Sequence, residues 1–113
     1  MLAVAQILFA LAAVSGIILA AMHIMKKTVP VTFALPHGIF AAAGLVLLLL
    51  TYVQGTPSVR VPLILFVLAA LGGFVLFASH LRARPLMMPL IVIHAVLAVG
   101  AFVLLVFQAN LIS

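Results

Sequence analysis

Four long apolar segments, separated by three short polar breaks, dominate the hydropathy pattern of the chain. They cover approximately residues 2–25, 31–53, 61–81 and 86–111. Each segment reaches the roughly 20 residues that an α-helix needs to cross the hydrocarbon core of a bilayer. Because the breaks are short, consecutive helices are expected to run antiparallel. The pattern predicts an all-α fold, an integral membrane four-helix bundle that forms a single transmembrane domain over residues 1–113.

The chain also matches itself when it is shifted by 57 residues, with residues 1–56 forming one copy and 58–113 the other. Residues 7–13 (ILFALAA) fall on residues 64–70 (ILFVLAA), and the shift gives 16 identities in 56 aligned pairs. Two histidine pairs and the pair Gly16 and Gly73 lie in register. Since each copy is one helical hairpin, we expect two tandem hairpins related by a pseudo-two-fold axis along the membrane normal.

The composition agrees with a membrane protein and excludes several kinds of chemistry. Of the 113 residues, 70% are hydrophobic and 4% are charged, and Asp and Glu are both absent. Without carboxylates there is no acid pair for a glycosidase or an aspartic protease, and no side-chain anion for Mg²⁺ or Ca²⁺. Without cysteine there is no disulfide, thiolate zinc site or iron–sulfur cluster. Chemistry in this chain therefore has to depend on histidine.

The five cations lie in the breaks between the apolar segments, which indicates topology and argues against nucleic-acid binding. Lys26 and Lys27 lie in the first break, Arg60 in the second, and Arg82 and Arg84 in the third. The positive-inside rule places the first and third breaks in the cytoplasm and both termini outside. We expect a multi-pass protein of the bacterial inner membrane, in contact with lipid, whose first helix is retained because no signal-peptide pattern surrounds it.

All four histidines belong to the repeat. His23 and His80 end the first and third apolar segments, and His37 and His94 lie early in the second and fourth. This arrangement predicts a histidine layer in the cytoplasmic half of the bundle. Alanine and glycine occur on the same helix faces, and ionisable residues in membrane segments usually face the bundle interior. We expect the four histidines to be shared ligands.

Haem b, as one or two groups, is the cofactor that suits these residues best, since it takes paired imidazoles and needs small residues beside its ring. The deeper histidines, His37 and His94, are the expected axial pair, with His23 and His80 available for a second haem. The propionates would be neutralised by nearby cations: Lys26, Lys27, Arg82 and Arg84. Copper or zinc held by the same four histidines is the alternative, because imidazole suits both metals.

In its bundle and paired histidines the chain resembles small bacterial membrane b-type cytochromes. The resemblance implies electron transfer, or an oxidoreductase reaction with a membrane-soluble partner such as a quinone or with a redox partner protein. Two other functions stay open: a non-enzymatic subunit of a larger membrane complex, with homo-oligomers included, and a protein that handles copper or zinc. The spacing from His23 to His37 equals one that cytochrome b uses on single helices, but Pro30 and the basic residues interrupt it here.

Overall fold

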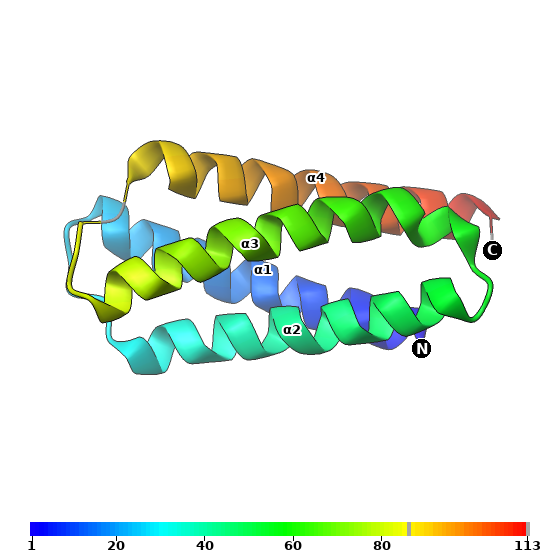
Figure 1. Ribbon diagram of the computed structural model, residues 1–113, viewed down its shortest axis with the longest axis horizontal. Coiled ribbons are helices and arrows are strands. Elements are labelled where there is room, and N and C mark those ends of the chain that lie inside the picture. Colours follow the sequence, from blue (N-terminus) through cyan, green and yellow to red (C-terminus); the bar gives the residue numbers. More distant parts are fainter. Residues whose placement is uncertain (86, 113) are drawn as a thin grey trace.

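The protein is a bundle of four α-helices (Figure 1). The computed structural model describes the backbone of residues 1–85 and 87–112 and the side chains of residues 1–85 and 87–107. The helices are α1 (Leu2–Ile24), α2 (Val31–Val53), α3 (Arg60–Leu81) and α4 (Met88–Ile112), and a one-turn 3₁₀-helix, η1 (Pro57–Val59), precedes α3. The described residues contain no strand. The predicted all-α class and the four helices are confirmed, and their bounds agree to within two residues.

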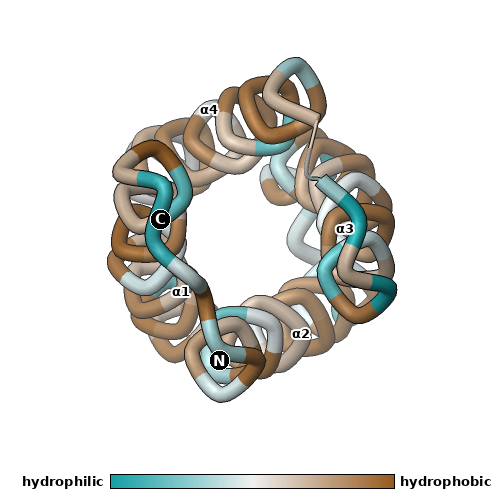
Figure 2. The backbone as a smooth tube through the Cα atoms, turned by 90° about the vertical axis from the view of Figure 1, so that its left-hand side faces the viewer, coloured by the Kyte–Doolittle hydropathy of each residue, from teal (hydrophilic) through white to brown (hydrophobic). Residues whose placement is uncertain are grey.

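The helices run back and forth along the long axis of a molecule with extents of 42 × 23 × 19 Å. The α1–α2 and α3–α4 connections lie together at one end, here called the two-loop end, and the termini and the α2–α3 connection lie at the other (Figure 1). Viewed along the bundle, the helices follow one another around a common axis (Figure 2). Helix α2 is therefore diagonally opposite α4, and α1 is opposite α3.

All four helices are long and apolar enough to cross a membrane. A helix of 23 residues, such as α1 or α2, is about 35 Å long, against about 30 Å of hydrocarbon in a typical bilayer. Their outward faces are apolar as well: Ile17 and Phe74 are each 69% exposed, and Phe107 is 62% exposed. Large exposed apolar surface on every side is what lipid-facing helices need, so these are four candidate membrane-spanning helices.

The buried core lies in the half of the bundle that contains the termini. Its centre is a stack of Phe9 from α1 on Phe66 from α3, with ring centroids 3.8 Å apart and planes 2° from parallel. Leu48 and Leu105 pack in the same cluster and are fully buried. Both pairs are 57 residues apart in the chain. The interior of this half therefore uses equivalent positions of the two sequence copies.

The other half of the bundle, toward the two-loop end, is packed less tightly. None of the described residues in 13–43 or 70–100 is buried, although these ranges include all four histidines. The side chains of this half are partly accessible even where they face a neighbouring helix. The histidines thus lie in the part of the bundle where the interior is most open.

Helices α1 and α3 end in the same kind of turn. Lys26 has φ 59° and Ala83 has φ 55°, both in the left-handed region that glycine usually occupies. In each turn the N–H of this residue donates to the carbonyl three positions back, and the next N–H donates to the carbonyl five positions back. These bonds satisfy carbonyls that the helix end would leave unpaired, so each helix ends before its basic loop.

Replacing Ala83 by glycine should stabilise the protein. A left-handed backbone strains an L-residue and suits glycine, so Ala83→Gly should raise the free energy of unfolding by about 0.5–1 kcal/mol. Ala42→Gly, at an exposed position inside α2, is the matched control and should lower it by about 1 kcal/mol. Thermal unfolding in one detergent measures both changes. An Ala83→Gly protein that melts below the wild type would contradict this explanation of the turn.

Candidate functional site

His37 of α2 and His94 of α4 meet in the interior of the bundle. Their ring centroids are 6.1 Å apart and their planes are inclined by 82°. Helices α2 and α4 are diagonally opposite each other in the bundle (Figure 2), so the contact between His37 and His94 crosses the bundle axis. The sequence singles out these two histidines as the deeper pair, and the structure brings them together.

Each of the two rings is anchored to the backbone of the adjacent helix. His37 Nδ1–H donates to the carbonyl oxygen of Ala12 in α1, and His94 Nδ1–H donates to that of Ala69 in α3, both at 2.7 Å. A carbonyl can only accept, so Nδ1 has to carry the proton in both rings. In a neutral imidazole the other nitrogen, Nε2, then keeps its lone pair. Both histidines therefore have the tautomer that allows Nε2 to bind a metal.

The two Nε2 atoms remain accessible. No hydrogen bond to either atom is found among the described residues, and no described side-chain nitrogen or oxygen is both fully buried and unpartnered. Histidines that bind metals in proteins commonly donate their second N–H to a backbone carbonyl, which fixes the orientation of the ring. His37 and His94 have this arrangement.

Glycine makes the close approach of the histidines to α1 and α3 possible. A Cβ atom on Gly16 would lie 2.9 Å from Cε1 of His37, and one on Gly73 would lie 3.1 Å from Cε1 of His94. A larger residue at Gly16 would push the His37 ring away from its carbonyl acceptor, and one at Gly73 would require the His94 ring to move by a few tenths of an ångström. The small residues that share a face with the histidines in the sequence thus have a specific role here, since each glycine accommodates the edge of an imidazole.

The surroundings of the two histidines differ in one polar group that the sequence analysis does not single out. Ser15 Oγ donates to the carbonyls of Leu11 and Ala12, at 2.9 and 3.0 Å, and lies 3.4 Å from Nδ1 of His37. The position equivalent to Ser15 in the second copy is Gly72. Comparison of the two sequence copies could have identified Ser15, because Ser15 is not matched in the second copy whereas its neighbour Gly16 is matched by Gly73.

The other two histidines lie apart from this pair. His23 and His80 are half-buried in the last turns of α1 and α3, and no hydrogen bond to either ring is found among the described residues. Within that part of the chain, no three residues of the types His, Cys, Asp and Glu come close enough to hold one metal ion. The structure therefore forms a two-histidine site and does not gather all four histidines around one point.

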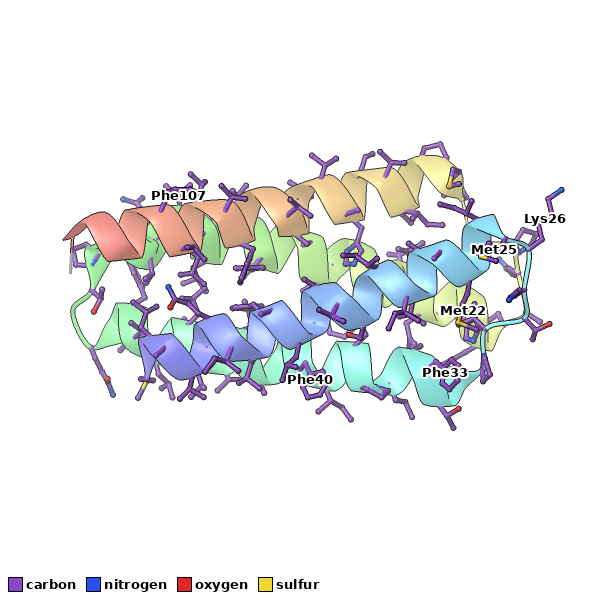
Figure 3. The ribbon with its side chains drawn as sticks, turned by 180° about the vertical axis from the view of Figure 1, so that it is seen from behind. Met22, Met25, Lys26, Phe33, Phe40 and Phe107 are labelled. Carbon is purple, nitrogen blue, oxygen red and sulfur yellow. The ribbon has the colours of Figure 1, made fainter. Side chains whose placement is uncertain are left out.

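The basic residues that the sequence analysis selects as propionate partners are all exposed in the loops of the two-loop end: Lys26, Lys27, Arg82 and Arg84. Figure 3 shows the side chain of Lys26 extending away from the bundle, beyond Met25. The cations therefore lie beyond the His37–His94 pair, at the end of the bundle where His23 and His80 also lie.

The distance between the ring centroids of His37 and His94 is similar to that expected for two imidazoles bound to one metal. Metal–imidazole bonds are about 2 Å long, so two such bonds and the two ring radii account for the 6.1 Å between the centroids. On the two-loop side of the buried Ala12 and Ala69, none of the described residues in 13–43 and 70–100 is buried. These features fit a flat, apolar cofactor with two axial histidine ligands.

Comparison of the chain with protein-family models, with curated proteins and with solved structures finds no match in any of the three. The interpretation of the site accordingly depends on the chemistry of its own residues.

Gly16→Ala should disturb the site, whereas Gly38→Ala should not. Helix propensity alone favours alanine by about 1 kcal/mol, and a Cβ on Gly38 would meet nothing within 4 Å, so that variant should be slightly more stable. At Gly16 the clash with His37 should cost roughly 1–3 kcal/mol and reverse the sign. Thermal unfolding in detergent measures the stability of each variant. ¹⁵N NMR of the histidine rings detects the loss of the hydrogen bond from His37 to Ala12.

Equal stabilisation by both substitutions would show that the contact between Gly16 and the imidazole is absent. Gly73→Ala extends the test to the second histidine. It should have a smaller effect, because the added Cβ would lie slightly farther from the ring.

Proposed function

We propose that this chain is a membrane-embedded b-type cytochrome in which His37 and His94 are the axial ligands of a haem b. Its function would be electron transfer, or a redox reaction with a membrane-soluble partner. The observation that carries the proposal is the pair itself: two imidazoles across the bundle axis, each with Nδ1–H bound to a carbonyl and Nε2 available.

A haem suits this site better than a bare metal ion. Zinc sites in proteins usually have three or four protein ligands, whereas the described residues bring only two histidines together. A porphyrin supplies the remaining metal ligands itself, so two axial imidazoles complete the coordination. Met22 and Met25, whose thioethers would suit copper, lie at the two-loop end beside Lys26 (Figure 3).

The residues around the pair have separate roles in this proposal. The carbonyls of Ala12 and Ala69 hold the rings in one orientation, and Gly16 and Gly73 let the rings lie against α1 and α3. The exposed cations of the two-loop end would neutralise the propionates. Haem supplies one-electron redox chemistry when it is bound. With His37 and His94 both holding the haem, no ligand position would stay free, so the site would suit electron transfer better than the binding of a gas.

We further propose that the bundle is two tandem hairpins produced by duplication. Support comes from contacts between equivalent positions of the two copies, which are 57 residues apart: Phe9 with Phe66 and His37 with His94. The left-handed residues Lys26 and Ala83 are related in the same way. A pseudo-two-fold axis along the bundle would pass between the members of each pair. One haem on this axis, between His37 and His94, is the simplest arrangement, and His23 and His80 would be the ligands of a second.

The proposed location is the bacterial inner membrane, with the two-loop end in the cytoplasm and both termini outside. Four of the five cations lie in the two connections at this end. Cationic loops are retained on the cytoplasmic side during insertion. The histidine half of the bundle would then lie near the cytoplasmic face.

Reporter fusions test this orientation. Alkaline phosphatase fused to the C-terminus should be active, and a fluorescent protein that folds only in the cytoplasm should stay dark there. Equalising the loop charges, with Lys26 and Lys27 changed to Gln and Lys placed at Gln54, should weaken the preference. A C-terminus found in the cytoplasm would contradict the orientation.

The purified protein should be red, and its reduced form should have the sharp α-band of a six-coordinate low-spin haem that binds carbon monoxide poorly. His37→Ala and His94→Ala should each remove the haem held between these two residues, leaving at most the signal of a second haem held by His23 and His80. His23→Ala and His80→Ala are the matched controls and should keep the haem between His37 and His94.

Haem stoichiometry in folded, monodisperse protein is the measurement for all four variants. Colourless wild-type protein from haem-replete cells would refute the cytochrome proposal. Equal, complete loss of the bound cofactor at all four histidines would instead support one site shared by the whole set.

A further inference from the structure

The two histidine–carbonyl bonds of the site have the same length but different surroundings. His37 Nδ1–H donates to the Ala12 carbonyl at 2.7 Å, and His94 Nδ1–H donates to the Ala69 carbonyl at the same distance. At Ala12 a second side-chain donor is present, because Ser15 Oγ lies 3.0 Å from the same carbonyl oxygen. Within the described part of the chain, only the His37 ring shares its acceptor with another side chain.

The position of Ser15 follows from the geometry of its own helix. A serine inside a helix can donate to the carbonyl three or four residues back, and Ser15 reaches both, with Leu11 at 2.9 Å and Ala12 at 3.0 Å. Its oxygen also lies 3.4 Å from Nδ1 of His37, which is long for a hydrogen bond. Ser15 therefore acts on His37 mainly through the carbonyl that they share.

A carbonyl oxygen has two lone pairs, and this number separates the two copies. Inside a helix each carbonyl accepts the amide four residues later, which here belongs to Gly16 for Ala12 and to Gly73 for Ala69. The amide and the imidazole together use both lone pairs of the Ala69 oxygen. At Ala12 the Ser15 hydroxyl is a third donor. The bond that holds the His37 ring should therefore be the weaker of the two.

The strength of this bond affects the nitrogen on the other side of the ring. When an imidazole donates its N–H more strongly, its second nitrogen becomes more basic and a better electron donor to a metal. Nε2 of His94 should therefore donate more strongly than Nε2 of His37. Hydrogen bonds to the ligands of a haem are one of the means by which a protein sets its reduction potential.

We infer that Ser15 is a positioning residue that makes His37 the weaker electron donor of the pair and raises the reduction potential of the site. Weaker donation stabilises the oxidised, more positive iron less, so the reduced form gains. The effect belongs to the first hairpin, because Gly72 is the equivalent of Ser15 in the second copy. The difference between the rings concerns the chain alone, and only the effect on the potential rests on the proposed function.

NMR of the histidine rings tests the difference between the two hydrogen bonds without a haem. The sample is the full chain, prepared without haem in lipid nanodiscs, and His37→Gln and His94→Gln assign the two Nδ1–H proton resonances. A stronger hydrogen bond moves such a resonance downfield, so the His94 proton should lie downfield of the His37 proton. Ser15→Ala should move the His37 resonance downfield and close most of the difference.

Gly72→Ser transfers the hydroxyl to the second copy. A Cβ there would lie 3.7 Å from Cβ and 3.9 Å from Nδ1 of His94, which are ordinary contacts, so the variant should fold. Its hydroxyl can donate to the Ala69 carbonyl three residues back, as Ser15 does to Ala12. The His94 resonance should therefore move upfield, toward that of His37.

Redox titration of the haem-loaded protein tests the effect on the potential. Ser15→Ala should favour the oxidised form by about two-fold to five-fold, which lowers the midpoint by about 20–40 mV for a one-electron couple. Gly72→Ser should raise the midpoint by a similar amount. Ser15→Thr keeps a hydroxyl that can bond the same carbonyls, so it should keep the wild-type value.

Thr51→Val is the matched control for the loss of a hydroxyl. Thr51 Oγ1 donates to the Leu47 carbonyl at 2.8 Å, four residues back in α2, and Thr51 is buried in the half of the bundle that contains the termini. This variant loses the same kind of bond as Ser15→Ala but at a carbonyl that no histidine uses. It should leave both ring resonances and the midpoint unchanged.

Equal Nδ1–H resonances for the two rings, or a His37 resonance that does not respond to Ser15→Ala, would overturn the inference. A midpoint that stays constant or rises in Ser15→Ala would do so as well. Colourless protein whose His37 resonance responds would refute the haem and retain the effect of Ser15 on the ring. Red protein in which neither the resonance nor the midpoint responds would refute the inference and retain the haem.

Discussion

The structure depends on how an interior histidine satisfies its N–H in a chain that has no carboxylate. A polar group left without a partner in an apolar interior costs several kcal/mol, so a backbone carbonyl of the neighbouring helix has to accept the bond. His37 uses Ala12 and His94 uses Ala69. That choice of acceptor determines the tautomer of each ring, and it requires the helices to approach at Gly16 and Gly73. Helix spacing, ring orientation and available lone pairs thus follow from one type of hydrogen bond.

The bundle separates its buried core from its histidines along its length. The half with the termini holds the stacked rings of Phe9 and Phe66 and the fully buried Leu48 and Leu105. The histidine half has no buried residue among those described. Close packing in one half holds the helices in register, so the other half can contain polar groups and less complementary packing without loss of the fold. A site that has to admit a large planar group benefits from such a division.

The two copies of the hairpin have equivalent residues in the interior of the bundle and differ on the outer surface between α1 and α2. The stacked phenylalanines and the facing histidines both pair a residue with its equivalent in the other copy. Ser15, Thr32 and Pro36 have no such equivalents, and all three line a groove on this surface. The interior thus pairs equivalent residues of the two copies, whereas the outer surface between α1 and α2 does not.

The sequence by itself determined the number, bounds and apolar character of the helices, because runs of about 20 apolar residues between basic, proline-containing breaks leave few other structures. It also placed His37 and His94 at equivalent positions of the two copies and left histidine as the candidate for any chemistry. Only the tertiary structure decided that these two rings meet at 6.1 Å, while His23 and His80 lie apart from them, because this depends on the rotation and crossing of packed helices. The roles of the Ala12 and Ala69 carbonyls could not be predicted from the sequence either. Every residue has a carbonyl, and only the packing of the helices decides which one an imidazole reaches.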